Sequence, residues 1–299
     1  MFKFFLIGFL FVGTAQAQRQ SLNPELFWQP SFAHAAATLS YLYENNDGTD
    51  TVAGIAETFK GEGKGVRLDL EYGVLSFLSL GAAFSYQNLR TTTTQAGVSA
   101  VEKREGPDDW EFVLKMVVPS DRTRLYLGTR YRLSSENNQE KTGLSRFNRA
   151  AGGNALAPYF GVQFPMGPLW VGLKGQWTLF DDRTLEVDGV ETTLLSGGDE
   201  LDVVANFEYN SGLFVFGLGA GVFLKQKEDS TVIASSVTTS TQSSEKTHAL
   251  IYTKLALWRW LEVLLQADYF YTVEQEISTT LTREEAKEIQ GRASLRFSY

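Results

Sequence analysis

The sequence ends with GRASLRFSY (residues 291–299), which alternates strictly between two kinds of side chain. The odd positions carry glycine, alanine, leucine, phenylalanine and tyrosine, and the even positions carry arginine or serine. A period of two is the spacing at which side chains share one face of a β-strand. Chain ends usually fray, so alternation up to Tyr299 predicts a final strand held by neighbours.

The same alternation recurs along the chain, for example in GVRLDLEYGV (65–74), WEFVLKMVV (110–118) and ELDVVANFEY (200–209). It predicts strands, each of about 11–14 residues, in twelve segments: 32–44, 62–75, 78–90, 107–118, 123–135, 153–165, 168–180, 200–210, 213–225, 246–257, 260–273 and 287–299. Residues 260–273 also suit an amphipathic helix by propensity. We favour a strand there, because its neighbours require an even strand count and lipid tolerates no open sheet edge.

The connections between these segments alternate in length. The short ones have about two to four residues, and the long ones have about 12–21: 45–61, 91–106, 136–152, 181–199, 226–245 and 274–286. Tight turns at one end and long polar loops at the other are typical of membrane-spanning barrels. A strand of thirteen residues is about 43 Å long and, tilted by about 40°, spans about 33 Å, enough to cross the apolar band.

Aromatic residues cluster at the expected strand ends, as in the two aromatic girdles of a membrane barrel. Those near short turns are Tyr72, Phe77, Phe164, Tyr209, Phe214, Trp258, Phe297 and Tyr299; those near long loops are Tyr43, Tyr86, Trp110, Tyr131, Trp177 and Tyr271. The sequence thus predicts an all-β fold: a closed antiparallel transmembrane barrel of about twelve strands in meander order. The closing strand, 287–299, should pair with the first strand, 32–44.

The first residues predict export. Residues 1–17 contain one lysine, an apolar run and Ala15-Gln16-Ala17, which fits a signal peptide cleaved after Ala17. Residues 18–31 form an N-terminal segment that we expect on the periplasmic side, as a tail or folded inward as a partial plug. Without the signal, 26 basic residues face 35 acidic ones, so the net charge is −9 and no nucleic-acid partner is expected.

These features together resemble the bacterial outer-membrane β-barrel superfamily over residues 32–299. In that superfamily the last strand usually ends in an aromatic residue and carries a signal for the barrel-assembly machinery. Leu295, Phe297 and Tyr299 match its alternation, whereas Gly291 lies further from the end than the common pattern has it. The resemblance implies a location in the outer membrane and contact with its lipids and lipopolysaccharide; it names no substrate.

Few residues suggest catalysis or metal binding. The chain has no cysteine and two histidines, His34 and His248, which we expect at opposite rims of the barrel. Neither precedes a serine in the His-x-Ser arrangement of outer-membrane phospholipases, so a lipid hydrolase with an activated serine is disfavoured. Neither ENNDGTD (44–50) nor DDRTLEVDGVE (181–191) fits a calcium-loop pattern, and we expect no cofactor. Asp188-Gly189 instead predicts a hairpin tip, giving loop 181–199 its own β-ribbon.

The most specific clue to function is the charge on the inward-facing positions. Alternation places nine basic and seven acidic residues in the lumen: Arg67, Lys115, Arg124, Arg130, Arg132, Lys174, Lys254, Arg292 and Arg296, with Asp69, Glu71, Glu111, Asp202, Glu208, Glu262 and Asp268. Dry burial of so many charges is costly unless each is paired. We therefore expect either a salt-bridged, hydrated network or a narrow aqueous channel.

Three functions fit the sequence in different ways. The charged lumen favours a small channel for modest polar or anionic solutes, in which arginines 124, 130 and 132 form a ladder or pair with Glu71 or Glu111. Long Ser/Thr-rich loops such as STVIASSVTTSTQSSEK (230–246) suggest a non-conducting surface or scaffold protein. A lipid-active enzyme is the third reading. The oligomeric state is left open.

Overall fold

A computed structural model describes residues 30–299, apart from 53, 108–109, 120–122, 135–137, 142–145, 148–152, 189, 212, 274 and 279–280. In this part of the chain the regular elements are β-strands. Within the described residues, no helix is long and apolar enough to cross a membrane. The expected signal peptide and most of the expected N-terminal segment lie outside these residues.

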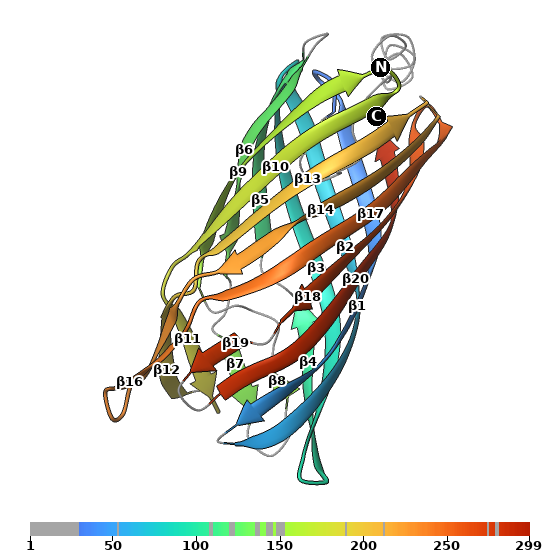
Figure 1. Cartoon of the computed structure of the whole chain (residues 1–299). Coiled ribbons are helices and arrows are strands. Elements are labelled where there is room, and N and C mark those ends of the chain that lie inside the picture. Colours follow the sequence, from blue (N-terminus) through green and yellow to red (C-terminus); the bar gives the residue numbers. More distant parts are fainter. Residues whose placement is uncertain are drawn as a thin grey trace.

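Twelve of the described strands form the wall of one closed barrel (Figure 1). They are β1 (Ala35–Val52), β2 (Ile55–Leu75), β3 (Leu78–Gln95), β5 (Trp110–Pro119), β6 (Arg124–Leu133), β9 (Ala155–Met166), β10 (Leu169–Phe180), β13 (Glu200–Asn210), β14 (Phe214–Lys225), β17 (Ser244–Trp258), β18 (Leu261–Thr272) and β20 (Leu281–Ser298). Each pairs antiparallel with the next, and β20 pairs with β1 from Ala36↔Ser298 to Val52↔Leu281. The predicted fold class, meander order and final strand are confirmed.

Residues 260–273, which also suit a helix by propensity, form the strand β18 and its preceding turn. It pairs with β17 on one side and β20 on the other. Trp258, Trp260 and Phe297 stack in sequence beside the turn before it, with ring centroids 5.7 and 6.2 Å apart. Aromatic rings gathered at a strand end are typical of the interface girdle of a membrane barrel.

The remaining strands lie in the long connections: β4 (Val98–Pro107), β7 (Asn138–Lys141), β8 (Arg146–Phe147), β11 (Arg183–Val187), β12 (Val190–Gly197), β15 (Glu228–Val232), β16 (Val237–Thr241) and β19 (Gln275–Ser278). The predicted ribbon in 181–199 is confirmed, because β11 pairs with β12 and Asp188 has the positive φ of 51° that a tight hairpin turn requires.

On the next ribbon, β15–β16, a hydrogen bond from Ser240 and the ammonium of Lys227 hold the pKa of the Asp229 carboxyl below its ordinary value.

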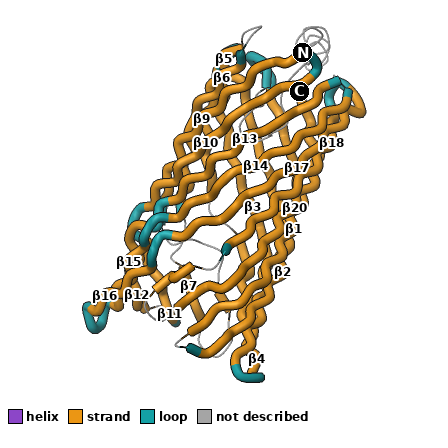
Figure 2. Tube along the Cα trace, in the orientation of Figure 1, coloured by secondary structure: helices purple, strands orange, loops and turns teal. Residues whose placement is uncertain are grey.

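The prediction that residues 45–61 and 91–106 are loops is wrong. Residues 45–52 and 55–61 extend β1 and β2 as a continuous hairpin, and β3 and β4 form another (Figure 2). The sequences of these extensions carry no apolar alternation, as is expected of a hairpin with both faces in water. Backbone pairing continues there nevertheless, because each peptide group still finds a partner across the hairpin.

The barrel has two distinct ends. The short turns lie at the end that also carries the described N-terminal residues and the C-terminus, and the ribbons project from the other end (Figure 1). We call these the short-turn end and the long-loop end. The chain is fixed at the short-turn end by reciprocal backbone hydrogen bonds between Ala35 and Tyr299, of 2.8 and 3.1 Å.

The outer surface between the two ends is apolar. Large side chains on the odd or even positions of each strand are exposed, among them Leu68, Leu114, Leu173, Leu218 and Leu265. Several expected girdle residues, including Tyr72, Trp110, Phe164, Trp177 and Tyr209, are exposed as well. The alternate positions point into the barrel, where the polar residues lie, and this separation is the one that a barrel in lipid requires.

Candidate functional site

The sixteen charged residues expected in the lumen all lie on barrel strands, at positions that are buried or half-buried. Several of them contact partners two strands away. Side chains on the outside of a curved sheet point away from one another, whereas those on the inside converge. Contacts between strands that are not neighbours therefore lie inside the barrel.

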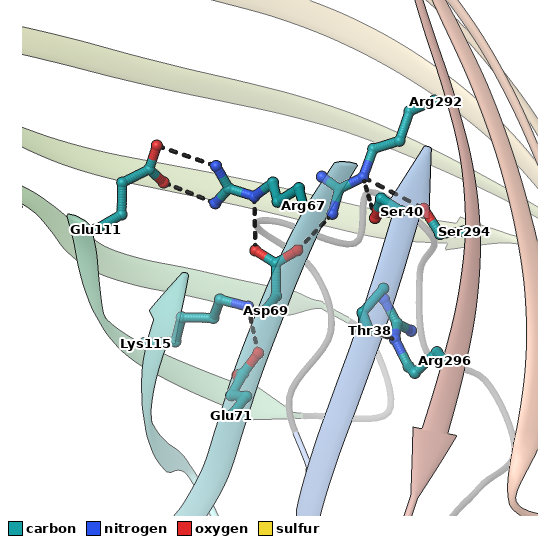
Figure 3. A network of polar contacts seen from close by, with 10 residues as sticks. All are labelled: Thr38, Ser40, Arg67, Asp69, Glu71, Glu111, Lys115, Arg292, Ser294 and Arg296. Carbon is teal, nitrogen blue, oxygen red and sulfur yellow. Dashed lines mark hydrogen bonds and ion pairs between the residues drawn. The ribbon is translucent and has the colours of Figure 1, made fainter. Parts of the chain in front are cut away.

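Asp69 is the centre of one network of polar contacts. Its carboxylate accepts hydrogen bonds from Arg67 Nε at 2.9 Å and from Arg292 at 2.7 Å (Figure 3). The guanidinium of Arg67 also forms a bidentate pair with Glu111, at 2.7 and 3.1 Å. Arg292 Nε donates to Ser40 Oγ at 3.0 Å. Asp69 thereby joins Arg67 on β2 to Arg292 on β20, two strands away.

Two further acids bind the lysines and the arginine nearer the short-turn end. Glu71 accepts from Lys115 Nζ at 2.8 Å. Glu262 bridges Lys254 Nζ at 3.0 Å and Arg296 at 3.1 Å. The side chains of Lys254 and Arg296 are only 4% and 2% exposed, so these charges are removed from bulk water and depend on Glu262.

Tyrosine and amide side chains fill the lumen beside these charges. Tyr252 extends from β17 across β14 to donate to Glu208 at 3.1 Å, and Asn206 donates to its hydroxyl at 3.3 Å. The ring crosses β14 over Gly217, where an added Cβ would lie 2.0 Å from Tyr252 Cζ. Tyr126 and Gln163 are buried on the opposite wall and bond to each other at 3.3 Å. The short-turn half of the lumen is therefore packed.

The three arginines of β6 do not form a simple ladder. The Arg124 guanidinium lies over the ring of Trp170 at 3.9 Å, and that of Arg132 lies over Phe180 at 5.2 Å. Cation–π contacts of this kind hold the planar group against the wall. Arg130 lines the central cavities described next.

Two cavities occupy the middle of the lumen. The larger, of about 370 Å³, lies toward the long-loop end, and the smaller, of about 40 Å³, lies on its short-turn side. We call the larger one the vestibule. Arg67, Arg130 and Arg292 line both cavities and so form the partition between them. The arginine partition therefore separates the vestibule from the smaller cavity on the short-turn side.

The expected position of His248 at the outer rim is wrong. The residue is 3% exposed, points inward from β17 and lines the vestibule. Its Nδ1 lies 3.1 Å from Asp202 and its Nε2 lies 2.8 Å from Asp268, and its ring stacks on Phe270 at 4.3 Å. His248 has the same parity as Lys254 on one strand, so the alternation that placed Lys254 inside predicts this position too. His34 lies beside β1 at the short-turn end, as expected, and contacts the Phe32 carbonyl at 2.9 Å.

Comparison with known proteins supports the fold. No model of a known protein family matches the sequence, and no curated protein matches it significantly. Among solved structures, it is similar to the COG4313 outer membrane channel from Pseudomonas putida F1, with 12% identity, a TM-score of 0.65 and coverage of 93% of this chain and 100% of that one. It is also similar to the transport unit of the autotransporter AIDA-I from Escherichia coli, with 11% identity, a TM-score of 0.54 and coverage of 99% and 97%. The chain therefore has the fold of the bacterial outer-membrane β-barrels.

Proposed function

We propose that this protein is a narrow channel of the bacterial outer membrane for small polar or anionic solutes. The observation that carries the proposal is the arginine partition: three guanidinium groups line two cavities that lie in series inside a closed barrel. Rings of basic side chains are a general means of favouring anions in a pore.

The electrostatics of the lumen support anions over cations. Asp69 is shared by Arg67 and Arg292, and Glu111 is held by Arg67. Among the described residues, those that line both cavities are the three arginines, whereas Asp69 lines the smaller cavity alone. An anion in this low-dielectric space is attracted more strongly than it is in bulk water.

The packed short-turn half supports a low conductance. Twelve strands enclose a lumen between the filled interior of eight-stranded barrels and the open water of sixteen-stranded porins. Tyr252, Gln163 and Arg296 are almost completely buried in that half. A solute that crosses this half therefore requires these side chains to move, which favours a low conductance.

The contacts of His248 support a channel over a lipid hydrolase. Both ring nitrogens lie on carboxylate oxygens of Asp202 and Asp268, so neither is placed on a serine hydroxyl. A serine nucleophile needs a ring nitrogen as its base.

Planar-bilayer recording on the purified barrel tests the proposal. We expect small, discrete current steps in the wild type and a lower anion preference in the variant Arg130→Gln. The matched control is Arg90→Gln, since Arg90 is exposed on β3 outside the cavities. A wild type that shows no steps in any salt refutes the channel.

A further inference from the structure

Lys174 lies in the vestibule without a counter-charge. It is 8% exposed on β10 and lines the cavity. Among the described residues it makes no ion pair or hydrogen bond. The residues across from it on the neighbouring strands are Gly161 and Val204, which offer no polar side chain.

Three acids line the vestibule, Glu44, Asp202 and Asp268, and each has a contact of its own. Asp202, the acid nearest to Lys174 in register, binds His248 Nδ1, and Asp268 binds His248 Nε2. Burying an ammonium group without a partner is costly, and the cost is recovered when an anion binds it. Lys174 therefore marks a place where an anionic group is stabilised.

The same cavity offers hydrogen-bond acceptors. Four glutamines line it, and three of them, on different strands, donate an amide N–H to a neighbour: Gln176 to Thr178, Gln266 to Asp268 and Gln290 to Glu288. Their carbonyl oxygens remain to accept hydrogen bonds, which the hydroxyl groups of a solute donate. A cavity of about 370 Å³ falls within the usual size of small-molecule sites, roughly 300–1,000 Å³.

We propose that the vestibule binds a small hydroxylated carboxylate, with its carboxylate on Lys174 and its hydroxyl groups on the glutamine oxygens. This inference names the solute class and rests on the proposed channel for its role in the cell. The binding site itself stands on the cavity and its side chains.

Isothermal titration of the full-length barrel in detergent micelles tests the site with three probes. D-gluconate carries the carboxylate and the hydroxyls, acetate carries only the carboxylate, and sorbitol carries only the hydroxyls. We expect saturable gluconate binding at least about tenfold tighter than that of either partial probe, since a hydrogen bond to a charged group is worth that factor or more.

Variants of Lys174 separate the site from general folding. Lys174→Gln should weaken gluconate binding about tenfold or more, whereas Lys174→Arg should keep it within a few-fold. Lys227→Gln, an exposed lysine between β14 and β15, is the matched control and should bind as the wild type does. Heat-modifiable migration on gels reports whether each variant is folded.

The inference is overturned if wild-type protein binds gluconate no better than sorbitol or acetate, or if folded Lys174→Gln binds it unchanged. Binding in micelles does not require passage through the barrel, so this experiment tests the binding site independently of the channel. A barrel that binds gluconate but never conducts would support the proposed binding site and refute the proposed channel.

Discussion

Glu262 joins two buried cations in the short-turn half of the lumen. Its carboxylate is the partner of both Lys254 and Arg296, at 3.0 and 3.1 Å, and these two cations are 4% and 2% exposed. The substitution Glu262→Gln keeps the size of the side chain and removes the charge, so it isolates the electrostatic contribution.

The expected cost follows from burial. Breaking a buried ion pair by removing one partner costs about 3–5 kcal/mol, because the remaining charge is left in the interior. Glutamine retains one carbonyl oxygen that accepts a hydrogen bond from either cation, so we expect the lower end, about 3 kcal/mol.

Reversible urea unfolding in lipid vesicles, followed by tryptophan fluorescence, measures this free energy. The control is Glu62→Gln, which breaks the Glu62–Lys64 pair on the surface, where both side chains are 57% exposed. It should leave the unfolding midpoint unchanged, because exposed pairs contribute little. Replacing Glu262, Lys254 and Arg296 together by apolar residues of similar size should recover most of the loss. A loss below about 1 kcal/mol for Glu262→Gln refutes the reasoning, since it means that water reaches these charges.

Three further predictions concern the lumen and its closure. Gly217→Ala places a Cβ 2.0 Å from the Tyr252 ring, so it should cost about 1–3 kcal/mol in the same unfolding assay, and the double variant with Tyr252→Ala should show no added cost from the clash. Asp69→Asn removes the charge that Arg67 and Arg292 share, so the reversal potential in a salt gradient should shift toward that of a more anion-selective pore; an unchanged potential counts against the partition. Deleting residues 297–299 removes the pairs Ala36↔Ser298 and Ala37↔Phe297 and the Ala35–Tyr299 hydrogen bonds, so the folded fraction on unheated gels should fall, whereas Tyr299→Phe should fold normally.

The barrel wall could be predicted because lipid imposes a pattern on each strand separately. Inside the apolar band the outer face of each strand must be apolar. The alternation in a segment such as 65–74 therefore predicts both that it is a strand and which of its side chains face the lipid. The same parity places the sixteen charged residues. It applies equally to His248, whose rim position was predicted from its place along the strand without the use of parity.

The parts that could not be predicted depend on contacts distant in sequence. Which acid meets Arg292 is decided by the stagger of β20, β1 and β2, and nothing in any one strand specifies Asp69. The extended hairpin of β1 and β2 was missed for a different reason: beyond the apolar band both faces meet water, and residues 45–61 carry no apolar signal to mark a strand. The cavities and the unpaired Lys174 likewise follow from the closed geometry alone.

The proposed function requires that the arginine partition passes anions through the closed barrel. It is tested by the reversal potential of the wild-type protein in a planar bilayer with a tenfold potassium chloride gradient. We expect discrete steps and a reversal potential with the sign of chloride permeation. A barrel that never conducts, or one whose potential has the sign of potassium permeation, contradicts it.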